Sequence, residues 1–592
     1  MAKILLFLTT SALSFLNKVR NWQARRILQK RIRACSIKSS YRVVVYTAIF
    51  GSKDKLKEVR RYPGIDYVCF TDDENLKSRS WTIKKIDAPS IDPRKNAKIY
   101  KILPHRFFSN YEYSLWIDGT HIPTIDIRFL VHKFLVKDDI ALFSHPARRC
   151  IYEEMQACVK CNKDDAEIIK KQEAKYQREN YPEMNGLAAC TVILRRHNAP
   201  QIKKTMEDWW REIEQYSIRD QLSFNYVAHR NNLKYAVLPG DVYDNYFFTC
   251  TEHRLPDSAA LSVGWLLNGT PETASARIMG YNVHDYLISK NVSSIILHQP
   301  ESRFVFNLTL SKRKIYDILF TEMSVLVFVK IDSEEGVEYL IERCKKKNIK
   351  IVYAIGDVPS KRMLKMADAI IIASDYIAKI VPKRYRRKIF VAFDGYEQPE
   401  GLHKIHSKDR NIKLCFVSNL VWDKFPCIHE LPKDVRLKIV GPKQEILESS
   451  FKNSAVFKKS GFDFEYVPWD IRTVYQEILE CDIGIIPWAK IGLDQKVKSV
   501  NRLVMFMALG LPVIASPIPS YLKIIRHGEN GFIAKTSSEW MDYIIFLRDN
   551  PEKRKEIGEN ARADVLHRFS KEKQGEVYLN IFEQVRAKPT QR

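Results

Sequence analysis

The sequence predicts an α/β protein built from more than one domain. Over much of its second half, short apolar runs alternate with stretches of helical periodicity, which is the pattern of strand–helix–strand units in a parallel sheet. A chain of 592 residues is also too long for one hydrophobic core and suggests about three or four units of ~150 residues each. Its hydrophobic content of 45% is that of a folded protein rather than a disordered one.

The first 40 residues form a distinct basic segment. Residues 4–16 are mainly apolar, but a helix of this length is too short to span the ~30 Å hydrocarbon core of a bilayer. A run rich in Lys and Arg follows at 18–33, with apolar side chains at near-helical spacing among the cations. We predict that residues 1–40 form a basic amphipathic helix on the anionic inner face of the cell membrane. The alternative is a helix docked on the body of the protein itself.

The balance of charge points to anionic partners. Lys and Arg number 96 against 70 Asp and Glu, which suits a membrane surface, nucleotide diphosphates or nucleic acid. No zinc-finger, RNP-type or helix-turn-helix signal is present, so nucleic acid is not expected. The 11 cysteines, an odd number, indicate a reducing, cytoplasmic compartment. Cys158 and Cys161 form a CxxC without a second pair at zinc-site spacing, and we interpret them as structural thiols.

Residues 41–290 carry the first candidate site. The predicted elements are strands at 42–50, 66–71, 81–86 and 113–118 and a helix over 95–108. The fourth strand ends in Asp118, and Gly119 turns the chain at once. A carboxylate at the tip of a buried strand suits a divalent metal held at a cleft, and an unused charge there would destabilise the fold.

Four ordered blocks in this region are AKIYKILPHRFF, YSLWIDGTHIP, HPARRCIYEEMQAC and RDQLSFNYV. Together they resemble a GT-A-like family of putative hexosyltransferases known in bacteria and in the plant Golgi. The resemblance implies a mixed-sheet nucleotide-sugar domain over 41–290. It puts Asp118 in the place of the first acid of the DxD metal motif, with Thr120 where the second acid would stand. Mn²⁺ or Mg²⁺ would then need a ligand besides Asp118, and the candidates are His121, His145 and His253.

The same resemblance assigns roles to further residues. It places Lys98 and Lys101 against the donor diphosphate. Its catalytic candidates are Asp118, Asp220 and Glu154, with Asp220 handling the acceptor hydroxyl. Its candidates for contacts with the sugar or acceptor are His145, Arg149, Glu153 and Gln221. From the residues alone, Glu153 and Glu154 could instead form a solvated helix turn, and Asp220 could be a helix N-cap.

The remainder of the chain predicts two further domains, at 291–400 and 401–592. The apolar runs of the first are 295–297, 325–329, 350–354, 369–373 and 389–392. A turn-rich stretch at 394–401 marks the linker between the two domains. Each domain is expected to carry its own parallel sheet.

The stretch 481–516 predicts a buried strand, a cationic loop, a helix and a second strand. Ser499 is the expected N-cap of the helix, and Asn501 and Arg502 fall in its first turn. Free backbone N–H groups, the helix dipole and the neighbouring lysines favour an anion at this end of the helix. The alternative is an ordinary strand–helix–strand unit with a solvated basic loop.

The run KSVNRLVMFMALGLPVIAS, followed by NGFIA, resembles the nucleotide-sugar-binding half of a GT-B glycosyltransferase. The family is the large retaining one that includes sucrose-phosphate and lipopolysaccharide transferases. The resemblance implies a pair of Rossmann-like domains, a donor site without metal, and a helical tail near 551–569 that crosses back to the first half. Its donor-binding candidates are Asn419, Lys424, Lys498, Ser499, Asn501 and Arg502. Asn419 stands where an arginine is usual, and Met505 stands where a glutamate usually holds the ribose.

These observations lead to three hypotheses. The first is a two-domain glycosyltransferase that moves sugars from nucleotide-sugar donors to a glycan or polyprenyl-linked acceptor in capsule or O-antigen synthesis. The second keeps one active domain and makes the other a degenerate module that binds a glycan or a partner; Thr120 and Met505 are its support. The third, a membrane or nucleic-acid adaptor, rests on net charge alone.

Overall fold

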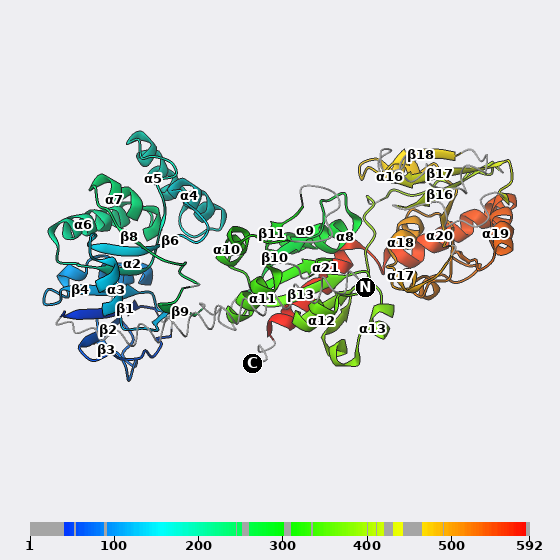
Figure 1. Cartoon of the computed structure of the whole chain (residues 1–592). Coiled ribbons are helices and arrows are strands. Elements are labelled where there is room, and N and C mark those ends of the chain that lie inside the picture. The colour runs from blue at the N-terminus through cyan, green and yellow to red at the C-terminus, as the bar shows by residue number, and fades with distance from the viewer. Residues whose placement is uncertain are drawn as a thin grey trace, which may run out of the picture. The chain divides into compact units, whose positions relative to one another are not determined.

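The computed structural model describes residues 41–51, 55–87, 92–243, 245–251, 260–300, 309–332, 336–399, 401–409, 411–418, 430–441, 464–488 and 490–587. Figure 1 shows the whole chain, and its contacts divide it into two compact units. The first unit holds the chain up to residue 254 together with residues 311–322, and the second unit holds the rest. The predicted membrane-binding segment 1–40 and His253 lie outside the described residues.

The first unit is built on a mixed sheet, as expected. Among the described residues its strands lie in the order β3-β2-β1-β4-β7-β6-β8, and β7 is antiparallel to both of its neighbours. The strands are β1 (Val43–Ile49), β2 (Ile65–Thr71), β3 (Thr82–Lys85), β4 (Tyr113–Ile117), β6 (Ile140–Ser144), β7 (Ala188–Arg195) and β8 (Ala236–Leu238). A two-stranded ribbon of β5 (His121–Pro123) and β9 (Phe248–Cys250) follows the end of β4.

Helices cover the faces of this sheet. They are α2 (Pro93–Ile102), α3 (Arg128–Phe134), α4 (Ile151–Lys160), α5 (Ala166–Arg178), α6 (Pro200–Gln215), α7 (Phe224–Arg230) and α10 (Lys312–Phe320), with short turns η1 (Pro104–Arg106) and η2 (Asp220–Leu222). Asp92 caps α2 by accepting a hydrogen bond from the Arg94 backbone N–H. The helix predicted over 95–108 is confirmed as far as Ile102. Its extension to 108 is wrong, because Pro104 cannot continue an α-helix and the chain changes to a 3₁₀ turn.

One edge of the first sheet gathers the ends of three parallel strands. Strand β4 runs parallel to β1, and β6 has the same direction because both β4 and β6 are antiparallel to β7. Asp118 follows the last residue of β4, and His145 follows the last residue of β6. Both predicted site residues therefore lie at the same edge of the sheet.

The second unit opens with a parallel sheet in the order β11-β10-β12-β13-β14-β15. Its strands are β10 (Ser262–Leu267), β11 (Ser293–His298), β12 (Val325–Val329), β13 (Lys350–Ile355), β14 (Ala369–Ile372) and β15 (Ile389–Val391). Strand β10 pairs with both β11 and β12, although we placed it in the first domain. The predicted boundary at residue 290 is therefore corrected: the second unit starts after residue 254.

Helices and short helical turns connect these strands. They are α8 (Ala274–Ala276), η3 (a π-helical turn, Arg277–Tyr281), α9 (Asn282–Ser289), α11 (Val337–Lys346), α12 (Lys361–Met366), α13 (Tyr376–Ile380) and η4 (a 3₁₀ turn, Lys383–Lys388). The alternation of strand and helix gives each strand the same direction and leaves all their carboxyl ends at one edge. Polar residues that follow β12, β13 and β15 are thus brought together.

A second parallel sheet follows in the order β18-β17-β16-β19-β20-β21. Its strands are β16 (Ile412–Val417), β17 (Val435–Gly441), β18 (Phe464–Pro468), β19 (Ile483–Ile486), β20 (Val513–Ala515) and β21 (Phe532–Ile533). Its helices are α16 (Val474–Leu479), α17 (Leu493–Lys496), α18 (Asn501–Ala508), α19 (Ser537–Asp549), α20 (Pro551–Leu566) and α21 (Lys571–Ala587), with the 3₁₀ turn η6 (Tyr521–Lys523). The α/β class with one mixed and two parallel sheets is confirmed.

The helix that returns to the first sheet of the second unit is α21. Its Tyr578 and Phe582 pack with Trp265 of β10, and the rings of Phe582 and Trp265 lie 5.8 Å apart. Helix α20, by contrast, contributes Ala561 and Val565 to the core around α18. The prediction that the crossing occurs over 551–569 is corrected, because the chain leaves the second sheet only after Phe569.

The described part of the chain contains no helix that is both long and apolar enough to cross a bilayer. Its cysteines are free thiols, and most of them are buried. Cys158 lies inside the core of the first unit, and the Cys161 sulfur lies 3.6 Å from the Thr321 hydroxyl. Both placements agree with structural thiols.

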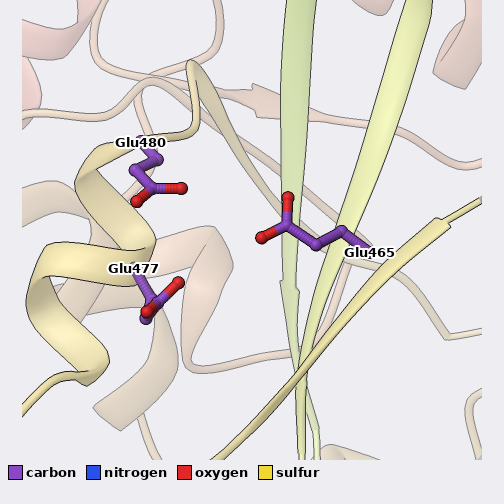
Figure 2. Close-up of side chains that lie close together, drawn as sticks. All are labelled: Glu465, Glu477 and Glu480. Carbon is purple, nitrogen blue, oxygen red and sulfur yellow. The ribbon is translucent and has the colours of Figure 1, made fainter.

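A buried lysine stabilises the outer strands of the last sheet. Figure 2 shows Glu465 of β18 facing Glu477 and Glu480, which come from the end of α16. The Lys438 ammonium group lies 2.9, 2.8 and 2.5 Å from these three carboxylates and is itself fully buried. The acidic cluster therefore encloses a lysine, which supplies the positive charge that a metal ion would otherwise bring.

We expect the substitution Lys438→Met to lower the free energy of unfolding by about 1–3 kcal/mol. Methionine keeps the apolar stem but removes the cation that the three carboxylates surround. Because these glutamates are partly exposed, water compensates for part of the loss. Urea unfolding would measure the effect, with Lys413→Met at the rim of the same cluster as the smaller-effect control. Equal stability of wild type and Lys438→Met would contradict this account.

Candidate functional sites

Four predicted residues of the first unit form one ion-pair cluster. The ammonium groups of Lys98 and Lys101, both on α2, each lie 2.6 Å from Asp220 Oδ2. Lys101 also lies 3.1 Å from Asp118 Oδ1. The structure therefore brings Lys98, Lys101, Asp118 and Asp220 together, from segments more than 100 residues apart in the chain.

The members of this cluster differ in their access to solvent. Asp118 keeps 29% of its side chain exposed, whereas Asp220 and Lys101 are almost sealed at 6% and 3%. Asp118 Oδ1 also accepts a hydrogen bond of 2.7 Å from Trp116 Nε1. The exposed part of Asp118 and the 19% exposed side chain of Lys98 are thus the groups that a ligand would meet first.

The charges within the cluster fix the protonation of Asp220. Burial alone would raise the pKa of this carboxyl, but the neighbouring Lys101 and Lys98 ammonium groups outweigh burial and hold the pKa well below its usual range. Burial also lowers the pKa of Lys98, which shares Asp220 with a second cation. A carboxylate with so low a pKa is a weak proton acceptor, so Asp220 suits holding the two lysines better than removing a proton from an acceptor.

The described residues of the cluster do not supply a ligand set for a divalent metal. Asp118 Oδ1 is engaged by Trp116 and Lys101, and the next position that the DxD motif would use is Thr120. The His121 ring is also engaged, with one nitrogen 3.1 Å from the Val242 carbonyl and the other 3.1 Å from the Thr120 hydroxyl. Among the described residues, the one grouping of three acidic, histidine or cysteine ligands is the glutamate cluster around Lys438. The expected metal at Asp118 therefore lacks a ligand set in this part of the chain.

A second network lies at the end of β6. The His145 side chain is fully buried, and its Nδ1 accepts backbone N–H bonds from Ala147 and Arg148 at 3.3 and 3.0 Å. Burial, with the nearby charges of Arg148 and Arg219, lowers the pKa of His145 to about 3. The ring is therefore neutral, with its proton on Nε2, which faces the Tyr316 hydroxyl at 3.2 Å.

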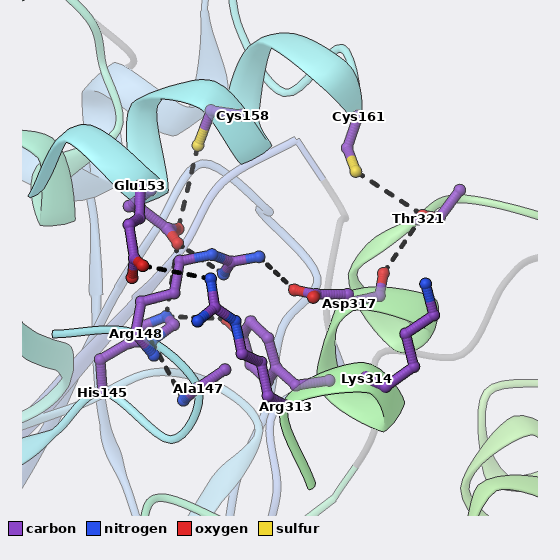
Figure 3. A network of polar contacts seen from close by, with 12 residues as sticks. His145, Ala147, Arg148, Glu153, Cys158, Cys161, Arg313, Lys314, Asp317 and Thr321 are labelled. Atoms are coloured by element: carbon purple, nitrogen blue, oxygen red, sulfur yellow. Dashed lines mark hydrogen bonds and ion pairs between the residues drawn. The ribbon is translucent and has the colours of Figure 1, made fainter. Parts of the chain in front are cut away.

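Helix α10 closes this network from a distant part of the sequence. Figure 3 shows Asp317 of α10 facing Arg148, whose other guanidinium nitrogen lies 2.7 Å from Glu154. Glu154 is sealed from solvent, while Glu153 beside it is partly exposed and pairs with Arg313 of α10 at 3.2 Å. Helix α10 is flanked in sequence by β11 and β12 of the second unit, yet it packs on the first unit.

The structure changes the interpretation of three predicted residues. A solvated helix turn does not describe Glu154, because its carboxylate is buried against Arg148. The same burial leaves no open path for the catalytic role that we predicted for Glu154. Arg149 is exposed and does not share the network of its neighbour Arg148. Gln221 is buried and accepts a hydrogen bond from Arg219 at 3.3 Å.

The donor-site prediction for the second unit centres on the start of α18. The helix begins at Asn501 with Val500, not Ser499, as its N-cap residue, and the Ser499 hydroxyl is a distant 3.5 Å from the Asn501 N–H. Arg502 donates a hydrogen bond of 3.2 Å to the Val417 carbonyl at the end of β16. Its guanidinium also lies 5.3 Å from the centre of the Trp488 ring. The predicted residues Asn419 and Lys424 lie outside the described residues.

The cationic loop before α18 meets the carboxyl edge of the first parallel sheet of its unit. The Lys498 ammonium lies 2.8 Å from Asp357 Oδ1, and Lys330 lies 2.6 Å from Asp357 Oδ2. Burial would raise the pKa of Asp357, but Lys330 and Lys498 outweigh it and hold the pKa at about 2. Asp357 therefore stays ionised between two cations.

Asp394 lies at the same edge of the sheet, but its pKa is shifted upward, whereas that of Asp357 is shifted downward. It is 6% exposed, and one of its carboxyl oxygens has no hydrogen-bond partner among the described residues. Burial raises its pKa to about 6, although a hydrogen bond from the Ser499 hydroxyl acts in the other direction. The Ser499 loop is thus tied to a carboxyl group that titrates close to neutral pH.

Comparison with known proteins adds to this geometry. Residues 27–256 match the family model of the "TOD1/MUCI70, glycosyltransferase-like domain", and residues 503–564, which begin inside α18 at Leu503, match "Glycosyl transferases group 1". The chain joins a TOD1/MUCI70 glycosyltransferase-like domain to a group 1 glycosyltransferase domain. The first of these forms most of the first unit, and the second includes most of helix α18 of the second unit.

The relatives of the TOD1/MUCI70 domain are distant. The chain is 28% identical over 217 residues to the probable hexosyltransferase MUCI70 of Arabidopsis thaliana, covering 32% of this chain and 37% of that protein. It is 27% identical over 230 residues to the alkaline ceramidase TOD1 of the same plant, covering 32% of this chain and 49% of that protein. The chain thus spans less than half the length of either relative.

A comparison with solved structures gives a distant similarity. A structure of Anabaena HepE with UDP and glucose aligns over 55% of this chain and all of that one, at 14% identity and a TM-score of 0.42.

Sequence reasoning missed several residues of both sites. Lys330, Asp357 and Asp394 follow three apolar runs directly or within three residues, so a search for polar residues after each strand would have found them. Arg219 sits beside Asp220 in the RDQ block. Tyr316 and Asp317 carried no signal, because nothing in the sequence around α10 tells that it packs on the first unit.

We expect Asp317→Asn to raise the hydrogen-exchange rate of the α10 amides by about ten-fold, equivalent to about 1.4 kcal/mol. The variant removes the ion pair with the buried Arg148 guanidinium and leaves the rest of the helix unchanged. Arg313→Gln is the matched control, since its pair with Glu153 is more exposed and should contribute little. Equal exchange in Asp317→Asn and wild type would show that this ion pair does not hold α10.

We expect Asp394→Asn to stabilise the protein by about 1–3 kcal/mol near neutral pH and to have no effect near pH 4. The folded pKa of about 6 lies above the ordinary value, so the stability contributed by the protonated group is lost as the pH rises through 6. Asp357→Asn should act in the opposite direction, because a pKa lowered to about 2 contributes stability at neutral pH that is lost on acidification. Urea unfolding at both pH values measures the two effects, and the same sign for both variants would refute this assignment.

Proposed function

We propose that the chain is a glycosyltransferase with two nucleotide-sugar sites, one in each unit. The observation that carries the proposal is the gathering of cations and carboxylates at the carboxyl edge of a sheet in both units. The first cluster lies inside the region that matches a glycosyltransferase-like model, and Lys498 of the second precedes the region 503–564 that matches a group 1 model. Open α/β sheets bind ligands at this edge. A fixed cation placed there stabilises the negative charge of a leaving diphosphate.

In the first unit, Lys98 and Lys101 would face the donor diphosphate, and Asp118 would contact the sugar. Lys98 is the more exposed of the two lysines and stands nearest to solvent. Asp118 is the carboxylate of the cluster that remains open. The buried Asp220 would hold both ammonium groups in place, which keeps their charge fixed before the donor arrives.

In the second unit, Lys498, Asn501 and Arg502 would hold the donor diphosphate at the start of α18, with Ser499 beside them. A diphosphate at this position would compete with Asp357 for the Lys498 ammonium. Asn419 and Lys424 remain candidates for the same role. No metal is required here, since backbone N–H groups and cationic side chains supply the positive charge.

The biological setting is part of the same proposal. Two transferases in one chain suit the assembly of a surface polysaccharide, such as a capsule or O-antigen, on a glycan or polyprenyl-linked acceptor. The basic segment 1–40 would hold the enzyme at the cytoplasmic face of the membrane, where such acceptors are found. Because TOD1 is described as a ceramidase, hydrolysis of a ceramide is included as an alternative outcome in the assays.

The alternative proposal keeps one active unit and makes the other a binding module. Thr120 in place of a second acid weakens the case for the first unit, and Met505 in place of a ribose-binding glutamate weakens it for the second. Calorimetric titration of variants that disable one site at a time separates the two readings. Nucleotide binding that disappears entirely with one variant would favour a single active unit.

We expect Asp118→Ala and Arg502→Ala each to abolish a different sugar transfer, lowering its rate by about 10²-fold or more. Each variant removes a charged group from one site only. The full chain would be screened against a panel of nucleotide sugars with mass detection of products, and a fluorescent ceramide would be included. Tyr111→Phe serves as the control, since the Tyr111 hydroxyl donates to Asp66, which belongs to neither cluster.

The outcomes of this screen are distinct. Loss of one product with each variant supports two independent sites. Loss of both products with either variant, while the fold is retained, would contradict independence. Ceramide hydrolysis without any sugar transfer would overturn the glycosyltransferase proposal for the first unit.

A further inference from the structure

The carboxylates of the first site are already neutralised within the protein. Asp118 and Asp220 bring two negative charges, and Lys98 and Lys101 bring two positive ones, all linked by contacts of 2.6 to 3.1 Å. A glycosyltransferase site with a DxD motif reaches a similar balance with a divalent metal and two acids. Here the two ammonium groups occupy the electrostatic position of the metal.

We propose that the first unit binds the diphosphate of its donor without a divalent metal, and that Lys98 and Lys101 take the place of the cation. The proposal rests on the proposed function, because it assumes a nucleotide-sugar site in this unit. It is an alternative to the expectation that Asp118 is a metal ligand.

Electrostatics argue against adding a dication to this cluster. The energy of two charges depends on their separation, so a cation close to an ion pair feels both partners at similar strength. A dication beside Asp118 would be attracted by that carboxylate and repelled to a similar extent by Lys101, which is 3.1 Å from the same oxygen. Little attraction is left to offset the loss of water from a strongly hydrated ion.

The two lysines have different parts in the proposal. Lys101 is held on three sides, by Asp118, by Asp220 and by the Trp116 ring, whose centre lies 5.5 Å from the ammonium. It is almost sealed and contributes a fixed positive potential. Lys98 retains 19% exposure and is free to turn part of its hydrogen-bonding capacity toward phosphate oxygens. A bound diphosphate would also favour the charged form of Lys98, which burial disfavours.

The test uses the full chain with Arg502→Ala and Lys498→Ala, so that binding at the second unit is weakened. UDP is titrated by calorimetry, first in EDTA and then in MnCl₂, with GDP and ADP as further probes. We expect the UDP dissociation constants in EDTA and Mn²⁺ to agree within about three-fold. When Lys98→Met is introduced into this double variant, UDP binding should weaken by about ten-fold in both conditions, because a charged hydrogen bond is lost.

The variant Lys101→Met gives a sharper readout. Without this ammonium, Asp118 and Asp220 lose most of their counter-charge, and UDP binding in EDTA should fall by about ten-fold or more. Mn²⁺ should then restore part of the binding, since the vacated position has gained net negative charge. A merely structural role of Lys101 would give loss of binding without rescue by Mn²⁺. Lys95→Met on the same helix is the matched control, and thermal unfolding checks that each variant is folded.

Failure of the proposal and failure of the proposed function give different results. UDP binding that is lost in EDTA and restored by Mn²⁺ in the protein with native Lys98 and Lys101 would overturn metal independence while leaving the nucleotide site intact. Unchanged binding in Lys98→Met would also overturn it. No binding of UDP, GDP or ADP under either condition, in a folded protein, would remove the nucleotide-sugar site from the first unit and the proposal with it.

Discussion

The contact of Asp220 with two lysines is the interaction on which the first unit depends. An isolated carboxylate in a nearly sealed position is strongly unfavourable, and so is an isolated ammonium group. Helix α2 solves both problems by presenting Lys98 and Lys101 one turn apart, so that both reach the same oxygen of Asp220. Asp118 then joins through Lys101 and remains partly open. The position of the partly exposed Asp118 carboxylate is therefore fixed by the buried Lys101 and Asp220.

The second unit uses the same principle in two places with different consequences. Lys438 lies among three carboxylates, one on β18 and two at the end of α16, where it has a structural role. Asp357 lies between Lys330 and Lys498, where the contact joins the edge of one sheet to the loop before α18. Only the latter involves a group that a phosphate could replace. A buried ion pair is therefore not enough to propose a binding site. We propose one only where the ion pair also lies at the edge of a sheet and beside the start of a helix.

The sequence was sufficient for much of the fold and for part of the sites. Apolar runs predicted the parallel strands, because strands buried on both faces of a sheet are apolar along their whole length. Motif resemblance assigned Lys98, Lys101, Asp118 and Asp220 to one donor site, but it did not predict the ion pairs that join them. The helix predicted over 95–108 was too long, since Pro104 ends the α-helical hydrogen bonding. The boundary at 290 was wrong, since β10 pairs with β12 of the second unit. Glu154 could not be placed from sequence, because its burial depends on Arg148 and on a helix 160 residues away. Side-chain environments of this kind depend on tertiary contacts that no local pattern records.

Helix α10 links the connectivity of the chain to the first site. The chain leaves the first unit after residue 254, returns to it for residues 311–322 and then leaves it again. On this return Tyr316 meets His145 and Asp317 meets Arg148, two groups that would otherwise be buried with incomplete partners. Arg148 in turn holds Glu154, so the polar interior at the end of β6 is completed only by a segment from the later part of the sequence. A cut at residue 254, or at the predicted boundary of 290, would therefore remove partners from the interior of the first unit, and its folding is coupled to the chain that follows it.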